Sequence, residues 1–351
     1  MFPSMRPFLA LAATLSLAMS AVGLNIPPSV FSLDDLKGAD TRPITDMYVF
    51  GDSYSDNCNG ARLILNPVIA ATAIPFPTCL PPPIGRADNA IAWPEVVSRF
   101  RPDWNVTIYA TYLNLSRRTS AATCDSLKQN QGSKDFASQI QSFTTYGNTQ
   151  LIPSGLKTNP NTSVASVMIG LNDIMLIQLK QWGQLPSTDT STGNLNDSSS
   201  CVMSNMNTLH SLGFRRFALF EIPPADTLAK LGDTPAHAAS TKQAVATLNA
   251  LNAQAAANLV KQWNDGSTIS IFPFVKLMTP MAQLEPSYNF TYPAGKYCNT
   301  TCPDPFKYVF TDGLHYSYQA FYLLANAVVR WLDPKWRSGP IFSDVDGSGS
   351  F

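Results

Sequence analysis

A serine and an asparagine each follow a short apolar run of this chain, at the point where a strand would end. Ser53 comes after the run 47–50 and Gly51, a residue type that allows a tight turn. A serine hydroxyl held there can act as a nucleophile, and its backbone N–H can help to hold an oxyanion. Asn172 follows the run 164–169, and its amide would be a second oxyanion donor. Taken alone, each residue also suits the cap of a helix.

An aspartate and a histidine lie three residues apart, shortly before the last predicted helix. Asp312 can accept a hydrogen bond from Nδ1–H of His315, which leaves Nε2 free to act as a base. The other two histidines, His210 in a predicted helix and His237 in a predicted loop, have no carboxylate at this spacing. A lone D-x-x-H is equally compatible with a histidine of the core.

The three blocks taken together, in this order, resemble the SGNH hydrolases, also called the GDSL lipase/esterase family. Secreted fungal acetylesterases of carbohydrate esterase family sixteen are the most similar group. The resemblance covers about residues 44–334, nearly all of the chain after its first segment. The motifs that carry it are G-D-S at 51–53, G-R-A-D-N at 85–89 followed by W-P-E at 93–95, G-L-N-D at 170–173, E-I-P-P at 221–224 and D-G-L-H at 312–315.

The resemblance implies a role for each of these residues. Ser53 would be the nucleophile that accepts the acyl group, His315 the base and then the acid, and Asp312 the residue that orients it. Asn172 and the backbone N–H of Ser53 would be two of three oxyanion donors. The third is usually the N–H of a glycine, and here Ala121 occupies that place. About eight residues near 112–119 are extra relative to the family pattern.

Strand-like and helix-like segments alternate along the chain, which favours a doubly wound α/β fold. The family resemblance implies a flavodoxin-like three-layer α/β/α arrangement around a five-stranded parallel sheet. Five apolar runs are predicted strands: 47–50, 106–110, 164–169, 217–222 and 268–272. Helical spacing is found at 93–100, 173–182, 200–212, 241–263 and 318–332, with Ser317 as the expected N-cap of the last helix.

Three predicted loops are long: 57–88, 180–199 and 273–311. Loops of this length are often functional. The last one carries several aromatic residues, which either stack on sugar rings or pack the loop itself. These residues are Tyr288, Phe290, Tyr292 and Tyr297.

The N-terminus has the features of a secretory signal. Arg6 precedes the apolar run 8–19, which is too short for a bilayer span and suits the core of a signal peptide. We therefore expect a signal peptide at 1–22, a single domain at 24–338 and a frayed tail at 339–351. Secretion agrees with six cysteines, of which Cys298 and Cys302 are the expected local pair, and with six N-glycosylation sequons. The sequons are at Asn105, Asn114, Asn161, Asn196, Asn289 and Asn299.

The charge balance excludes several classes of function. Lys plus Arg and Asp plus Glu are 24 each, and charged residues make up only 14% of the chain. A basic nucleic-acid-binding surface and an acidic disordered chain are both disfavoured. No dinucleotide-binding, P-loop, zinc-protease or G-x-S-x-G motif is present, so we expect no cofactor. A metal cluster is the minor alternative, and it would use Asp52, Asp56, Asp173 and Asp312.

The sequence thus predicts a secreted, monomeric serine esterase that removes acetyl or short acyl groups from plant cell-wall oligosaccharides. No membrane span is expected. Two alternatives stay open. One is a lipase or phospholipase whose groove would be lined by 63–83. The other is a non-catalytic carbohydrate-binding protein on an esterase scaffold, which the altered block around Ala121 would favour.

Overall fold

The computed structural model describes residues 39–57, 59, 74–75, 91–111, 135–146, 158–185, 193–284, 288, 290–298 and 307–336. All of them belong to one compact unit that spans residues 26–339. The expected signal peptide, the tail, Ala121 and the extra residues 112–119 lie outside the described residues. So do Cys302 and the sequons at Asn114, Asn289 and Asn299.

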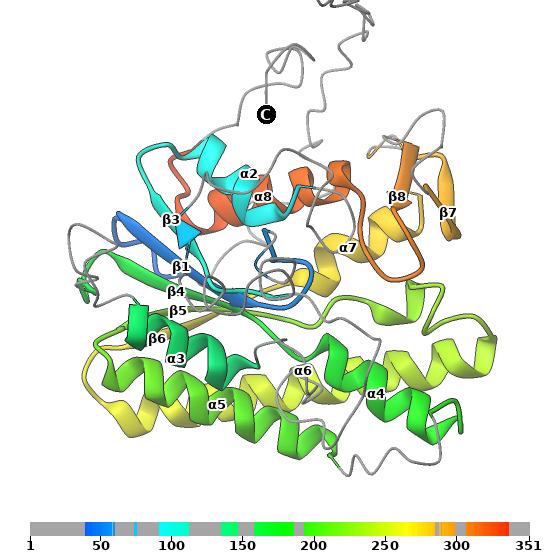
Figure 1. Ribbon diagram of the computed structural model, residues 1–351, viewed down its shortest axis with the longest axis horizontal. Coiled ribbons are helices and arrows are strands. Elements are labelled where there is room, and N and C mark those ends of the chain that lie inside the picture. Colours follow the sequence, from blue (N-terminus) through cyan, green and yellow to red (C-terminus); the bar gives the residue numbers. More distant parts are fainter. Residues whose placement is uncertain are drawn as a thin grey trace, which may run out of the picture. The chain divides into compact units, whose positions relative to one another are not determined.

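A twisted sheet with the strand order β2-β3-β1-β4-β5-β6 forms the centre of this unit (Figure 1). Strands β3, β1, β4, β5 and β6 run parallel, and β2 pairs antiparallel with β3 at the edge. Among the parallel strands alone, the second along the chain (β3) lies outside the first (β1), and the other three follow in order on the other side, which is the flavodoxin order. The strand bounds are Asp46–Gly51 for β1, Ile74–Pro75 for β2, Asn105–Ile108 for β3, Ser163–Met168 for β4, Arg216–Phe220 for β5 and Thr268–Phe272 for β6.

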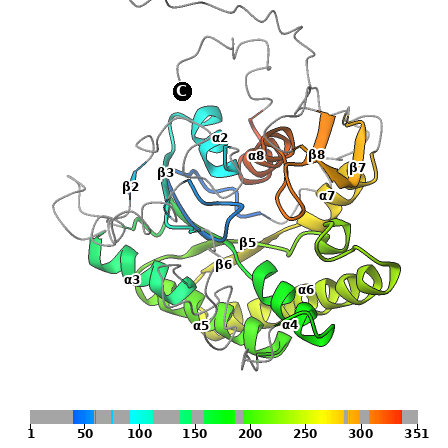
Figure 2. The same ribbon diagram turned by 45° about the vertical axis from the view of Figure 1, so that its right-hand side comes forward.

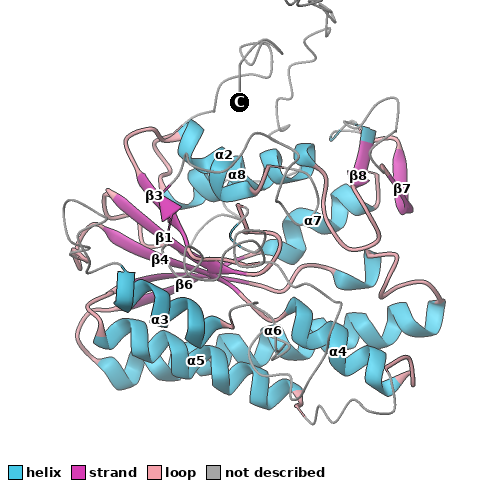
Figure 3. Cartoon of the chain, in the orientation of Figure 1, coloured by secondary structure: helices cyan, strands magenta, loops and turns pink. Residues whose placement is uncertain are grey.

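Helices cover both faces of this sheet (Figures 1 and 3). α2 and α8 lie on one face, and α3, α4, α5 and α6 lie on the other. The predicted α/β fold with five parallel strands is therefore confirmed. The helix bounds are Trp93–Phe100 for α2, Phe136–Tyr146 for α3, Leu171–Gln181 for α4, Leu195–Ser211 for α5, Pro235–Trp263 for α6, Phe274–Ala282 for α7 and Tyr318–Leu332 for α8.

Burial explains why the short apolar runs form these strands. All residues of β4 and β5 are buried, and so is β1 after its first residue. Strands covered by helices on both faces need continuous apolar sequence rather than alternation. α8 is buried nearly all round as well, and the hydroxyl of Ser317 accepts from the N–H of Ala320, as expected for an N-cap.

Two α-helices and three strands fall in segments where no regular structure was predicted. α3 was missed, and β2, α7 and a two-stranded sheet fall in the predicted long loops. That small sheet pairs β7 (Tyr292–Tyr297) with β8 (Tyr308–Phe310). The prediction of a loop at His237 was wrong, because Pro235 starts α6 and the hydroxyl of Thr234 caps it. Proline is favoured in the first helical turn, where its missing N–H costs no hydrogen bond.

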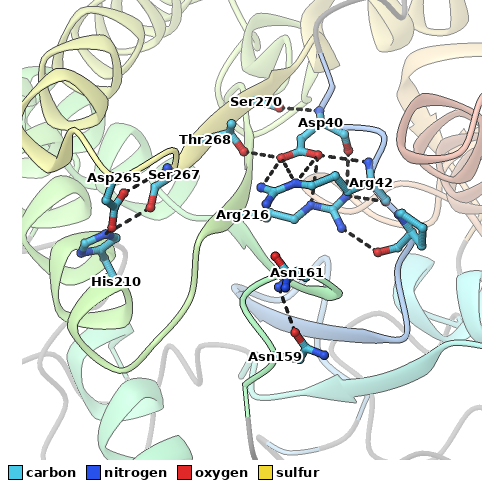
Figure 4. A network of polar contacts seen from close by, with 11 residues as sticks. Asp40, Arg42, Asn159, Asn161, His210, Arg216, Asp265, Ser267, Thr268 and Ser270 are labelled. Atoms are coloured by element: carbon cyan, nitrogen blue, oxygen red, sulfur yellow. Dashed lines mark hydrogen bonds and ion pairs between the residues drawn. The ribbon is translucent and has the colours of Figure 1, made fainter.

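A buried arginine in the sheet forms hydrogen bonds with residues 40–43, which belong to the first described segment. Arg216, in β5, is 1% exposed and donates to the carbonyl oxygens of Asp40, Arg42 and Pro43 (Figure 4). Asp40 in turn accepts from the hydroxyl of Thr268 in β6. Burial acts to raise the pKa of Asp40, but hydrogen bonds from Arg42 outweigh it and lower this pKa to about 2.

Candidate active site

The predicted site residues converge where the strand order of the sheet reverses. β1 and β4 are neighbours, with Gly51 and Met168 as Cα partners at their carboxyl ends. Ser53 follows the first of these strands and Asn172 the second. Parallel sheets bind ligands outside the carboxyl ends of their strands at such a switch point. The order of the strands therefore brings two distant segments to one edge.

A tight turn after β1 presents Ser53. The N–H of Ser55 donates to the carbonyl oxygen of Asp52 at 3.1 Å, and the Asp52 carboxylate accepts from the N–H of Tyr54 at 2.9 Å. Gly51 is required here by a close approach and not by the turn itself. A Cβ at this position would meet Ser55 Oγ at 2.8 Å, which is closer than real Cβ atoms come.

The D-x-x-H loop places the ring of His315 within hydrogen-bond distance of Ser53. His315 Nε2 lies 2.9 Å from Ser53 Oγ, and His315 Nδ1 lies 2.7 Å from Asp312 Oδ2. Both distances fall within the range of about 2.6–3.2 Å that proton transfer requires. Ser53 and His315 are 8% and 9% exposed as residues. The structure thus joins the hydroxyl, the imidazole and the carboxylate in one chain of hydrogen bonds.

The loop itself fixes the orientation of Asp312. Its Oδ1 accepts from the backbone N–H groups of Leu314 and His315, at 2.6 and 2.7 Å, which leaves Oδ2 for the imidazole. Burial acts to raise the pKa of Asp312, but the hydrogen bonds and charge of His315 outweigh it and hold this pKa below its usual value. A carboxylate that stays ionised is suited to hold Nδ1–H and to stabilise an imidazolium.

The other strand end places a buried amide. Gly170 has φ +125°, and a Cβ there would meet Ile222 Cδ1 at 2.7 Å, so this turn requires glycine. Asn172 follows in the first turn of α4 and is 5% exposed. Its side chain makes no hydrogen bond to another residue in the described part of the chain, nor does the backbone N–H of Ser53. Within the described residues, these two N–H groups therefore have no protein acceptor, and both follow strands that end side by side at Gly51 and Met168.

Several residues that support the site were not predicted from the sequence. Gln139 of α3 binds both backbone groups of Gly51, accepting from its N–H at 3.0 Å and donating to its carbonyl oxygen at 2.8 Å. Trp93 Nε1 donates to Ser55 Oγ at 3.0 Å. The apolar spacing of Phe136, Ile140 and Phe143 is the signal that predicts α3 and so draws attention to Gln139.

A further buried contact lies beside Asn172. The hydroxyl of Ser198 on α5 donates to Asp173 Oδ2, and these two residues are 2% and 1% exposed. No local pattern in the sequence indicates this contact, because it joins two helices across 25 positions.

The four aspartates of the alternative metal cluster are each engaged in hydrogen bonds. Within the described residues, no three His, Cys, Asp or Glu side chains are grouped so as to hold a metal ion. In the same part of the chain, no helix is long and apolar enough to cross a membrane. Cys201 is a free thiol and Cys298 is disulfide-bonded.

This arrangement can carry out acyl transfer. An imidazole that accepts the proton of Ser53 makes the hydroxyl a nucleophile, and a carboxylate on the far nitrogen keeps the required tautomer. N–H groups at the same edge can stabilise the negative charge that forms on a carbonyl oxygen.

Comparison with protein families gives one match across most of the chain. The model of a family described as GDSL-like lipase/acylhydrolase matches residues 47–328. This span contains Ser53, Asn172, Asp312 and His315. No curated protein sequence matches the chain.

Solved structures with similar folds include Axe2, an acetylxylan esterase from Geobacillus stearothermophilus. It shares 12% sequence identity at a TM-score of 0.44, with 83% of this chain and 95% of that chain covered. A point mutant of Axe2, described as an acetyl-xylooligosaccharide esterase, shares 13% identity at a TM-score of 0.42, with the same coverage. At these identities and TM-scores, neither match supports a statement about the activity of this chain.

Proposed function

The chain belongs to the GDSL-like lipase/acylhydrolase family and is a carboxylic ester hydrolase, and on this premise we propose that it is a secreted serine esterase for acetyl or short acyl esters of plant cell-wall oligosaccharides. Ser53 is the nucleophile, His315 the general base and acid, and Asp312 the residue that orients His315. Asn172 and the backbone N–H of Ser53 stabilise the oxyanion, with the N–H of Ala121 as the third donor.

The reaction has two steps. Ser53 Oγ bonds to the ester carbonyl carbon while its proton passes to His315 Nε2, and the carbonyl oxygen becomes an oxyanion. His315 then returns the proton to the departing sugar oxygen as the ester C–O bond breaks, which leaves an acyl–Ser53 intermediate. In the second step, water gives a proton to His315 and bonds to the same carbon. The bond to Ser53 Oγ then breaks as His315 returns its proton to that oxygen, which releases the carboxylic acid and restores the hydroxyl.

One observation carries this assignment of roles: His315 Nε2 lies 2.9 Å from Ser53 Oγ across 262 positions of sequence. If Ser53 were only a helix cap, its hydroxyl would need no histidine as a partner. If His315 were only a core residue, its ring would need no contact with the serine that follows β1. The contact with Asp312 at 2.7 Å completes the relation between nucleophile, base and orienting acid.

The substrate class and the compartment rest on the sequence. The motif blocks resemble those of secreted fungal acetylesterases. The first 22 residues resemble a signal peptide, and three of the described sequons, at Asn105, Asn161 and Asn196, have exposed asparagines. Exposed asparagines are available to carry glycans in a secreted protein.

Labelling of the secreted protein by a fluorophosphonate tests the mechanism. We expect one phosphonyl adduct by intact mass, formed with loss of fluoride, and its disappearance in Ser53→Ala. Ser55→Ala is the matched control, because Ser55 lies on the same turn but its Oγ is turned to Trp93. This variant should keep the adduct. A folded protein that takes no adduct, or keeps it without Ser53, would refute the assigned nucleophile.

Acyl chain length tests the substrate class. We expect kcat/KM to fall from p-nitrophenyl acetate to butyrate and to be lowest for palmitate, with acetylated xylo-oligosaccharides as good substrates. A rise with chain length would instead establish a lipase. Oligosaccharide binding without turnover would establish the non-catalytic alternative.

A further inference from the structure

The small β7–β8 sheet is continuous with the catalytic loop. β8 ends at Phe310, two residues before Asp312, and the chain returns at Tyr316 to form a bridge with Phe310. The loop between them is closed by the N–H of Thr311, which donates to the carbonyl oxygen of His315 at 2.9 Å. Figure 2 shows this sheet beside α7 and α8. Whatever binds on it therefore lies close to the reacting groups.

Packed aromatic rings connect this sheet to Tyr54, the residue that follows Ser53. The ring of Phe310 stacks on Tyr316 at 5.0 Å, and Tyr54, the residue after Ser53, packs edge-on against Tyr316 at 5.3 Å. These three rings are buried. At the start of the small sheet, the rings of Tyr292 and Tyr308 stack at 4.1 Å.

Tyr297 is the exception in this aromatic group. It is the strand partner of Phe310, yet its side chain is 49% exposed, whereas Phe310 is 2% exposed. Of the large hydrophobic side chains in the described part of the chain, Tyr297 alone is classed as exposed. A single exposed aromatic residue is ordinary on a protein surface. The distinctive feature of Tyr297 is its position next to the catalytic loop.

The distance from Tyr297 to the catalytic loop follows from the strand pairing. Paired strands lie about 4.8 Å apart, and each residue adds at most 3.8 Å, so the Cα atoms of Tyr297 and Asp312 are separated by about 12 Å or less. Ser53 Oγ lies beyond Asp312, across the ring of His315, so an oligosaccharide rather than a single sugar residue would contact both Tyr297 and Ser53. The four aromatic candidates of the predicted loop differ: Tyr288 and Phe290 are buried, Tyr292 stacks on Tyr308, and Tyr297 is exposed.

We propose that Tyr297 is a sugar-stacking residue that determines specificity for the alcohol part of the ester. This inference rests on the proposed function and deepens it by naming the residue that recognises the carbohydrate. The face of an aromatic ring carries partial negative charge and attracts the partly positive C–H groups of a pyranose, and the phenol can bond a sugar hydroxyl. One exposed ring matches one sugar face, whereas a long acyl chain needs a continuous apolar groove.

The test compares two substrates with the same enzyme. Acetylated xylo-oligosaccharide offers sugar rings to Tyr297, and p-nitrophenyl acetate offers none. In Tyr297→Ala, we expect the ratio of kcat/KM on the oligosaccharide to kcat/KM on p-nitrophenyl acetate to fall about tenfold, mainly through KM, which corresponds to about 1.4 kcal/mol. Tyr297→Trp should restore the ratio. Lys296→Ala removes an exposed neighbour from the same strand and should leave the ratio unchanged.

Each outcome decides a separate question. A wild-type protein active on p-nitrophenyl acetate but inactive on the oligosaccharide would refute the proposed substrate class. A wild-type protein active on both, whose ratio is the same in Tyr297→Ala, would refute only the role of Tyr297. An equal loss on both substrates would show a structural role and would also overturn the proposal. Titration calorimetry of Ser53→Ala with xylo-oligosaccharide, with and without Tyr297→Ala, tests the same contact without turnover, and equal affinities would contradict it.

Discussion

The hydroxyl of Tyr54 donates a 2.6 Å hydrogen bond to the carbonyl oxygen of Leu314, and so joins the residue after Ser53 to the residue before His315. The Tyr54 ring also packs edge-on against the imidazole, with the centroids 5.8 Å apart. Tyr54 and Leu314, the covalent neighbours of the proposed nucleophile and base, are therefore linked directly by a hydrogen bond. The 2.9 Å distance between Ser53 Oγ and His315 Nε2 depends on this contact as well as on the two side chains themselves.

Replacement of Tyr54 by Phe tests this relation. Tyr54→Phe keeps the buried ring and leaves the carbonyl group of Leu314 without its donor, which costs about 1–3 kcal/mol of stability. We expect kcat to fall about fivefold to tenfold with KM little changed, since an imidazole displaced by a fraction of an ångström transfers a proton less well. Steady-state kinetics and thermal unfolding measure both effects. A wild-type kcat in a destabilised variant would show that the contact serves only the fold.

Asn172→Ala removes one proposed oxyanion donor. We expect kcat to fall about 10²–10³-fold, because a donor aimed at a developing negative charge contributes mainly in the transition state. KM should change little for the same reason. Steady-state kinetics on p-nitrophenyl acetate would measure both constants. If kcat stayed within twofold of wild type, the amide would have no part in the reaction.

The pKa of Asp312 predicts a dependence on pH. The folded-state pKa lies below the ordinary value of about 3.9, so the stabilisation is fully present above that pH and is lost as the pH falls through the lowered pKa. Asp312→Asn removes the contribution of this carboxylate, so its free energy of unfolding should fall less than that of the wild type as the pH is lowered below about 3.9. The carboxylate is 45% exposed, which keeps the effect small.

Urea unfolding of both proteins at several pH values would measure that difference, and parallel curves would contradict it. The same variant tests the chemistry at neutral pH. An amide in place of the carboxylate favours the wrong tautomer of His315, and we expect kcat to fall about 10²–10⁴-fold.

Ser198→Ala tests the buried contact beside Asn172. The variant takes a hydrogen bond away from the Asp173 carboxylate, so we expect a loss of about 1–3 kcal/mol in unfolding free energy. A shift of Asp173 would also move Asn172 and lower kcat. Asn196→Gln is the matched control, because Ser198 is also the third residue of the sequon at Asn196 and both substitutions remove that sequon. Equal effects of the two substitutions on kcat and stability would argue against a specific role for the Ser198 hydroxyl.

The parallel sheet and the three-part site were predictable because their signals are local. A strand buried on both faces needs an apolar run, and all five parallel strands were predicted from such runs. Asp312 and His315 lie on one loop, so their spacing alone allows the contact that the structure contains. Ser53 and Asn172 follow two of the runs, and the strand order then brings them to one edge.

The contacts missing from the sequence analysis are those between distant segments. Gln139 meets Gly51 across 88 positions, and Tyr54 meets Leu314 across 260. Only tertiary packing decides that such polar groups become partners. The small β7–β8 sheet was missed for a related reason: β7 contains Pro and Gly instead of an apolar run, and β8 has only three residues, so their pairing with each other makes them extended.

The buried arginine at the opposite end of the strands predicts a large effect on stability without an effect on chemistry. Arg216→Met keeps most of the side-chain volume but removes the donors to three carbonyl groups and one charge beside Asp40 (Figure 4). Breaking a buried ion pair on one side costs about 3–5 kcal/mol. Arg215→Met is the matched control, because its pair with Asp265 is solvent-screened and should contribute little to stability. Urea unfolding should separate the two variants, and kcat of the folded Arg216→Met protein should equal that of the wild type. If both variants lost the same stability, the N-terminal segment would be held by contacts other than Arg216.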